Sequence, residues 1–228
     1  KSDGGIILKL FKNENKPVKV IPLGGMEQIG MNITAFEYED SIIVVDCGLA
    51  FPNEEMLGID LVIPDISYLK ENADKVKGLI ITHGHEDHIG AIPYALKELN
   101  MPIYATKLTI GIIEHKLEEH DMLKKVKRKV VKYGQHINLG CFRVEFIKTN
   151  HSIQDAAALA IYSPAGIVVH TGDFKVDYTP VFGDPIDLQR FGEIGKKGVL
   201  ALLCDSTNAE RAGFTQSEKS VGKALDNI

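Results

Sequence analysis

The sequence predicts an α/β fold. Two observations lead to this prediction: short apolar runs alternate with segments of helical periodicity, and polar clusters follow the ends of several apolar runs. The composition agrees, because 44% of the 228 residues are hydrophobic and 25% are charged, which is ordinary for a globular domain. A chain of this length can bury one sizeable core.

The apolar runs predict the strands and the periodic segments predict the helices. Each strand is expected where a few hydrophobic residues follow one another, and each helix where apolar residues recur every three or four positions. The strands are expected near residues 18–23, 32–37, 41–46, 79–82, 102–105, 129–133, 142–148, 157–163, 166–171 and 199–204. The helices are expected near residues 66–72, 89–99, 107–121, 186–195 and from 216 onward.

The end of the chain predicts a helix that continues to the last residue. Residues 215–218, Thr-Gln-Ser-Glu, have the spacing of a capping box, which begins a helix. Apolar residues such as Val221 and Leu225 continue the helical pattern. Because the sequence stops inside this helix and starts with Lys1 rather than Met, we expect it to be the N-terminal part of a longer protein.

The segment 82–90 has the composition of a metal site. Its sequence is Thr-His-Gly-His-Glu-Asp-His-Ile-Gly, and both imidazole nitrogen and carboxylate oxygen are zinc ligands. His83 and His85 are two residues apart and point the same way in an extended segment. Asp87 and His88 follow after a turn and can face a second ion. The alternative is a polar loop with solvated histidines, which explains one histidine better than three at this spacing.

This segment resembles the signature of the metallo-β-lactamase superfamily, and its complete set of donors resembles the two-metal hydrolases of that superfamily. Other motifs of the superfamily match in the right order at Asp46, which ends an apolar run, at His151 and at Asp173. The resemblance implies an αββα sandwich, C-terminally truncated in this sequence, with the metal ions at one edge of the two sheets.

The resemblance also implies two zinc ions in a complete active site, with Mn²⁺ as a possible replacement. The ligands of one ion would be His83, His85 and His151, those of the other Asp87 and His88, and the bridging ligand Asp173. Asp46 would support the ligand loop by hydrogen bonds without touching a metal ion.

The segment 203–221 resembles the entry into the β-CASP insertion of nucleic-acid-processing members of the superfamily. Asp205 lies at the position of an acidic motif of that group, so the implied catalytic carboxylates are Asp87, Asp173 and Asp205. In that group this carboxylate pairs with a histidine that protonates the leaving oxygen, and another late histidine completes the second metal site. Neither is present, since the last histidine is His170. We therefore expect a metallo-β-lactamase domain over residues 1–205 and the start of a β-CASP insertion over 206–228.

This group resemblance implies a zinc-dependent ribonuclease that hydrolyses phosphodiester bonds as a 5′–3′ exonuclease, an endonuclease or both. The segments 24–32, 150–155 and 172–175 add to the match. RNA is the implied partner, the implied location is the cytoplasm, and the full-length protein is implied to be a homo-oligomer. No membrane association is expected, because the sequence has no signal peptide and no apolar stretch of about 20 residues. We expect the 228 residues alone to cleave RNA poorly, because the two late histidines are missing.

Two other functions stay open on the sequence alone. A hydrolase of the same fold that acts on thioesters or lactams has the same signature over 82–90, although the segment 205–208 argues against this class. A non-catalytic metal-binding module is the second alternative, and the intact set of donors argues against it.

The net charge of −5 argues mildly against nucleic acid as a partner. Two bound zinc ions would, however, add positive charge near a substrate, and the basic residues are clustered. The cluster could contact phosphates, or it could be the solvated surface of a helix end and a hairpin. It comprises Lys124, Lys125, Lys127, Arg128, Lys129 and Lys132.

The cysteines predict a reducing compartment. Cys47, Cys141 and Cys204 are odd in number, far apart in sequence, and in or beside apolar runs. We expect them to be buried free thiols rather than disulfides or metal ligands.

Overall fold

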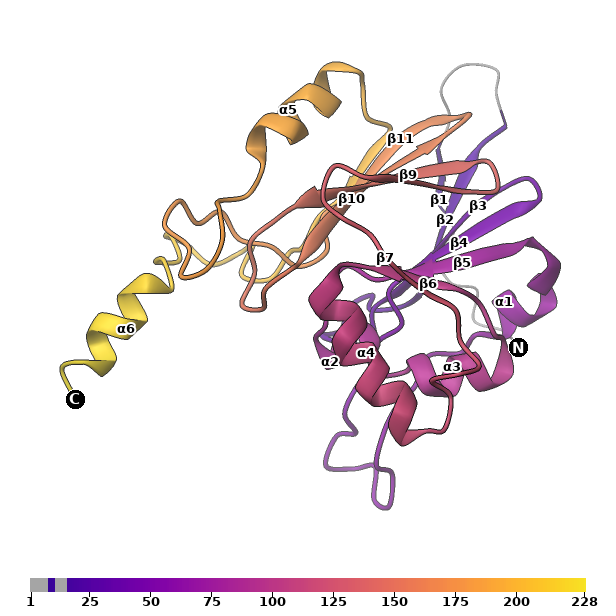
Figure 1. Ribbon diagram of the computed structural model, residues 1–228, viewed down its shortest axis with the longest axis horizontal. Helices are drawn as coiled ribbons and strands as arrows, with labels where there is room; N and C mark the ends of the chain where they lie inside the picture. Colours follow the sequence, from indigo (N-terminus) through magenta and orange to yellow (C-terminus); the bar gives the residue numbers. More distant parts are fainter. Residues whose placement is uncertain (1–7, 11–15) are drawn as a thin grey trace.

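The computed structural model describes residues 8–10 and 16–228, and these form two β-sheets with helices on both outer faces (Figure 1). The first sheet has the order β1-β2-β3-β4-β5-β6-β7 and the second the order β12-β11-β10-β9-β8. The strands of the first sheet are β1 (Leu8–Leu10), β2 (Val18–Gly24), β3 (Ile33–Tyr38), β4 (Ser41–Val45), β5 (Val76–Ile80), β6 (Ile103–Ala105) and β7 (Arg128–Val130). Those of the second sheet are β8 (His136–Leu139), β9 (Phe142–Lys148), β10 (Ala157–Ser163), β11 (Gly166–His170) and β12 (Ala201–Leu203).

The helices form the two outer layers. Those before residue 120 lie on the outer face of the first sheet: α1 (Ser67–Glu71), the short 3₁₀ helix η1 (Ala73–Lys75), α2 (Glu86–Ile89), α3 (Ile92–Glu98) and α4 (Lys107–Glu119). The helix α5 (Leu188–Lys196) lies on the outer face of the second sheet, and α6 (Lys219–Leu225) projects away from both sheets at the C-terminal end (Figure 1). This arrangement confirms the predicted αββα sandwich.

Alternating side chains of the central strands build two separate cores. In β4, Ile43 and Val45 face the second sheet, where the cluster includes the fully buried Phe142 and Phe146. Ile42 and Val44 face the opposite way and pack with the helical layer. A strand that is buried on both faces reads as a continuous apolar run rather than an alternating one, which explains the sequence of 41–45.

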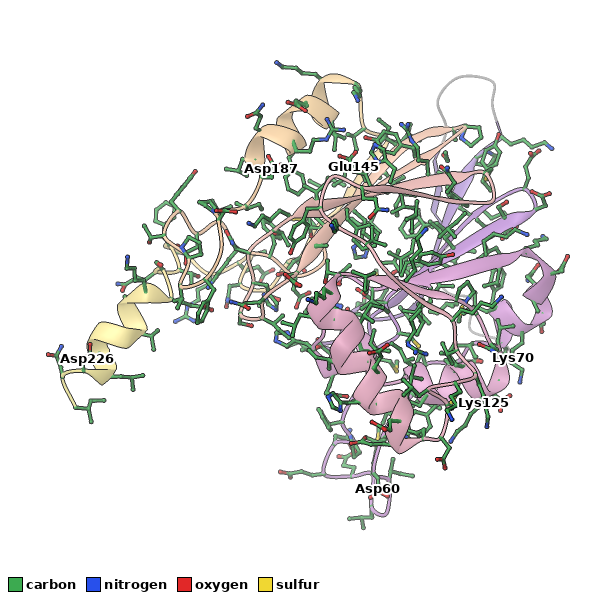
Figure 2. All side chains as sticks on the ribbon, in the orientation of Figure 1. Asp60, Lys70, Lys125, Glu145, Asp187 and Asp226 are labelled. Atoms are coloured by element: carbon green, nitrogen blue, oxygen red, sulfur yellow. The ribbon has the colours of Figure 1, made fainter. Side chains whose placement is uncertain are left out.

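A salt bridge attaches α5 to the second sheet. The buried carboxylate of Glu145 on β9 accepts hydrogen bonds from Arg190 Nε at 2.6 Å and Nη2 at 2.9 Å, and from the Tyr162 hydroxyl at 2.9 Å. Figure 2 shows Glu145 on the sheet beside α5, whose first turn follows Asp187. The apolar contact beneath the helix is made by Ile194.

The parallel strands bring several loops to one edge of the sandwich. Strands β4, β5, β6 and β7 are parallel, so their carboxyl ends meet at the same edge. The second sheet meets this edge too, because the Ala157 amide at the start of β10 donates to the Thr82 carbonyl at 2.9 Å. The histidine-rich segment therefore begins where the two sheets touch.

Several local predictions were wrong. The helix expected over 89–99 is shorter, because α3 covers Ile92–Glu98 and a separate helix, α2, already ends at Ile89. Strand β8 and the strand pairing of β1 were not predicted. The domain boundary between residues 205 and 206 stays a prediction. Residues 1–7 and 11–15 of the expected first domain lie outside the described part of the chain.

The expected capping box at 215–218 does not form. Helix α6 is preceded by Glu218 in helical conformation, with no side-chain cap. The Ser217 hydroxyl instead donates to Asp177 at 2.9 Å, and the Glu218 amide also points to this carboxylate, at 3.4 Å. A buried aspartate from another loop has taken the place of the local cap.

The expectation that all three cysteines are buried was also wrong. Cys47 is buried, Cys141 is half-buried and Cys204 is exposed, and all three are free thiols. Cys204 follows β12, which is an edge strand of the second sheet and pairs only with β11. No helix within residues 8–10 and 16–228 is long and apolar enough to cross a membrane.

Candidate metal centre

The histidine-rich segment is held in place from its first residue. Thr82 follows β5, and its amide donates to Asp46 Oδ1 at 2.8 Å while its hydroxyl donates to Asp46 Oδ2 at 2.8 Å. Both residues are buried. Asp46 directly follows the neighbouring strand β4, so the hydrogen bonds join two adjacent strand ends and fix where the segment leaves the sheet.

Three histidines converge at this edge. The Nε2 atoms of His83 and His151 each lie 3.1 Å from Nδ1 of His85. Their potential ligand atoms all lie within 4.8 Å of one another. A tetrahedral zinc shell with Zn–N bonds of 2.0–2.1 Å places its nitrogens about 3.3 Å apart. The spacing of the three nitrogens therefore fits one shared ion.

A second group lies next to the first. Its donors are His83, His88 and Asp173. Asp173 Oδ1 is 3.3 Å from His88 Nε2, while Asp173 Oδ2 is 3.6 Å from His151 Nε2. Asp87 Oδ2 is 3.6 Å from His88 Nε2. The two oxygens of Asp173 thus face two different groups of donors, which is the arrangement of a bridging carboxylate.

Asp46 lies behind this group rather than within it. Its Oδ2 atom is 2.8 Å from His88 Nδ1, and a carboxylate is only an acceptor, so Nδ1 must hold the hydrogen. The other ring nitrogen, Nε2, is thereby turned toward Asp173. This hydrogen bond sets the ring orientation of a candidate ligand, as such partners commonly do in metal sites.

The electrostatics of the two groups differ. Burial and the neighbouring histidines hold the pKa of His83 at about 2, so its imidazole is neutral, as a metal ligand must be. Burial also lowers the pKa of His151. At His88 burial opposes the charged form, but the carboxylates of Asp46 and Asp173 outweigh it and raise the pKa to about 10. His88 therefore lies at a point that strongly favours positive charge.

A groove passes over the second group. It is lined by parts of 20–26, 32–34, 45–46 and 170–173, and by Leu203 to Ser206, together with His88. Asp205 belongs to this lining, and its amide donates to the Thr171 hydroxyl at 3.1 Å. The structure therefore brings Asp205 near the predicted ligands, at the end of β12.

Two contributors were not singled out from the sequence. The Asn32 side chain lies 3.1 Å from His88 Nε2 and from the Asp87 carbonyl. Gly48 lets the backbones of two loops touch, because a Cβ there would lie 1.6 Å from the Asp87 carbonyl oxygen. Neither residue type suggests a metal site by itself, and only the pairing of distant loops reveals their part in it.

The part of the basic cluster that precedes β7 lies away from this site. Arg128 is engaged, since its Nε donates to Glu114 at 3.0 Å and its Nη1 donates to the carbonyls of Leu123 and Val126. Lys125 lies in the loop between α4 and β7 (Figure 2). This loop is at the end of the parallel strands opposite to the one that carries the histidines. Phosphate binding by the exposed lysines, Lys124, Lys125, Lys127 and Lys129, stays a prediction.

Comparisons with known proteins agree with this geometry. A family model described as "Metallo-beta-lactamase superfamily" matches residues 30–193. The chain is 49% identical to "Ribonuclease J" of Synechocystis sp. over 94% of its length, and 50% identical to "Ribonuclease J 1" of Streptococcus pyogenes over 92%. It spans only 34% and 38% of these two relatives.

A solved structure shares the fold at low sequence identity. It is a protein of unknown function from Enterococcus faecalis, with a TM-score of 0.54 and 22% identity over 70% of this chain and 44% of the other. The family model covers more than half of the chain, and the fold and donor groups agree with it. The chain belongs to the metallo-β-lactamase superfamily.

Proposed function

We propose that the protein acts as a zinc-dependent ribonuclease that hydrolyses RNA phosphodiester bonds. The observation that carries this proposal is Asp173, whose two oxygens face two adjacent groups of histidines in a chain about half identical to proteins named ribonuclease J. The chain spans about a third of those relatives, so the proposal concerns the activity of the whole protein. We include both 5′–3′ exonuclease and endonuclease cleavage in the proposal.

The donor groups fit two zinc ions. We assign one ion to His83, His85 and His151, the other to Asp87 and His88, and the bridging position to Asp173. Nitrogen-rich and mixed donor sets of this kind suit zinc, and carboxylate oxygens also suit Mn²⁺. When bound, two such ions lower the pKa of water and neutralise charge on a phosphate.

The remaining site residues would prepare this centre. Asp46 orients His88, and the Thr82 hydroxyl is 3.0 Å from His83 Nδ1, so each of these two candidate ligands has a partner behind it. Asp205, in the wall of the groove, would face the leaving group of a bound strand. We further propose that residues 206–228 begin a second domain that completes the RNA-binding surface.

The test is an RNA cleavage assay with zinc or Mn²⁺. The substrates are 5′-monophosphorylated single strands, and products are identified by mass. We expect cleavage by the full-length protein, its loss in Asp173→Asn, and very poor cleavage by the 228 residues alone. Equal rates for the two lengths would contradict the proposed contribution of a second domain. Hydrolysis of a lactam or thioester but not of RNA would contradict the nuclease proposal.

A further inference from the structure

Asn32 stands immediately before β3 and contacts two members of the second donor group, Asp87 and His88. Its Nδ2 atom lies 3.1 Å from the Asp87 carbonyl, 3.3 Å from Asp87 Oδ2 and 3.1 Å from His88 Nε2. We propose that Asn32 is a positioning residue that presents Asp87 and so sets the affinity of the second metal ion. This inference rests on the proposed ligand set.

The amide orientation follows from the chemistry of its neighbours. The two Asp87 oxygens accept hydrogen bonds only, so a donor must face them. An amide turned the other way would place oxygen against oxygen at both contacts. The space for Oδ1 lies toward Gly25, where an added Cβ would come within 2.8 Å of that oxygen. Gly25 therefore leaves room for the orientation in which Nδ2 faces Asp87.

A count of hydrogens shows what the amide can satisfy. An asparagine NH₂ group has two hydrogens, but three potential acceptors surround Nδ2. The two oxygens of Asp87 use both hydrogens, and His88 Nε2 is then left for another partner. That partner is Asp173 Oδ1, which lies 3.3 Å from Nε2, or a metal ion bound at this position, so the amide is free for Asp87 in either state. Asn32 would thereby hold the carboxylate of Asp87, whose Oδ2 atom lies 3.6 Å from His88 Nε2, beside the proposed second ion.

The backbone holds Asn32 independently of its side chain. Its amide donates to the Asp87 carbonyl at 3.0 Å, and its carbonyl accepts from the Gly48 amide at 2.9 Å. These bonds remain when the side chain is shortened. A substitution at this position can therefore change the presentation of Asp87 without releasing the loop.

The experiment compares zinc binding by the wild-type chain, Asn32→Ala and Asn100→Ala. Asn100 is the matched control, because its amide also donates to a backbone carbonyl, that of Lys125 at 3.0 Å, far from the histidines. Zinc is titrated calorimetrically into metal-free protein, and unfolding temperature is measured on the same samples. Visible absorption of Co²⁺-loaded protein reports the coordination of each ion.

We expect Asn32→Ala to weaken the affinity for one of the two zinc ions by about 10–100-fold, as loss of a hydrogen-bond partner of a ligand typically does. The other ion, the Co²⁺ spectrum of its site and the unfolding temperature of metal-free protein should match the wild type. Asn100→Ala should match it throughout.

If Asn32→Ala bound both zinc ions with the affinities of the wild type, the inference would be overturned and the proposed metal centre would stay intact. Equal weakening of both ions together with a lower unfolding temperature would overturn it as well, because Asn32 would then act only on the fold. Fewer than two ions in the wild-type chain would instead overturn the proposed ligand set. The three failures are therefore distinguishable.

Discussion

Asp46 illustrates how one buried carboxylate can determine the chemistry of a neighbouring ring. It accepts hydrogen bonds from the Thr82 amide and hydroxyl and from His88 Nδ1, so it joins the start of the ligand segment to one of its last donors. It also has a positive φ of 61°, a conformation that aspartate tolerates better than most residues. We propose that its role is to orient the candidate ligand His88.

We expect Asp46→Ala to weaken metal affinity by about 10–100-fold without abolishing it. The loss should fall mainly on the ion that His88 binds, because the ring can then rotate. Calorimetric zinc titration measures this effect, and Asp65→Ala, at an exposed residue whose carboxylate accepts from the Ser67 amide, is the control. A structure with an Asp46 oxygen bonded to the metal would contradict the assignment.

Gly48 gives a second prediction at the scale of one atom. A Cβ at this position would overlap the Asp87 carbonyl oxygen at 1.6 Å, and backbone cannot move as a flexible side chain can. We expect Gly48→Ala to displace Asp87 and His88, with loss of zinc binding and a lower unfolding temperature. In Gly111→Ala the added Cβ meets nothing within 4 Å in helix α4, so this control should be stabilised by up to about 1 kcal/mol.

At the scale of elements, the attachment of α5 depends on the pair formed by Glu145 and Arg190. Glu145 is 2% exposed, so removal of its partner leaves a buried charge. We expect Arg190→Ala to lower the free energy of unfolding by about 3 kcal/mol, near the lower limit for breaking a buried pair, because Arg190 is partly exposed. Arg143→Ala, which removes only a cation–π contact to Tyr162, should cost less than about 1 kcal/mol. Urea denaturation compares the two variants.

The same pair predicts a pH dependence. Burial alone would raise the pKa of Glu145, but the hydrogen bonds from Arg190 and Tyr162 outweigh it and lower the pKa. Because the folded pKa is below the unfolded value of about 4.3, the stabilisation is present above pH 4.3 and is lost as pH falls through the folded pKa. Urea denaturation between pH 7 and 3 should show a smaller loss in Glu145→Gln. An identical pH dependence in the two proteins would contradict this account.

The elements also show what sequence can and cannot specify. Strands such as β4 and β10 were predictable, because continuous apolar runs of this length fit a strand buried on both faces. Strand β8 was missed because only Ile137 and Leu139 in it are apolar, and its pairing with β9 is a property of the hairpin. The cap of α6 was predicted wrongly because Asp177, from a distant loop, contacts Ser217 and the Glu218 amide in place of the local capping box.

The same division holds for the candidate site. Its donors could be found from the sequence, since ligand types at a tight spacing are rare by chance. Their partners could not: Asn32 and Gly48 act through contacts with a segment about 40 to 55 residues away. Arg128 looked like part of a basic surface, yet its contacts with Glu114 and backbone carbonyls occupy it.

At the scale of the whole molecule, the candidate metal centre joins the two sheets. His83, His85, Asp87 and His88 follow a strand of the first sheet, whereas His151 and Asp173 follow strands of the second. We expect zinc to raise the unfolding temperature, because ligands that bind only the folded state stabilise it, by about 2.7 kcal/mol at 100 times the dissociation constant. Calorimetry with zinc and with a chelator measures this. In Asp173→Asn, zinc should raise the unfolding temperature by less than in the wild type. If zinc left the unfolding temperature of the wild type unchanged, a link between the sheets through the metal centre would be contradicted.

The placement of four donors within residues 83–88 has a consequence for refolding. A denatured chain keeps these four groups close together, so it can capture zinc before any sheet exists. Metal bound to the denatured state reduces the net stabilisation, and only His151 and Asp173 then distinguish the native centre from the premature one. Excess zinc should therefore slow refolding while it raises the final stability, and stopped-flow refolding at increasing zinc concentrations would reveal the two opposing effects.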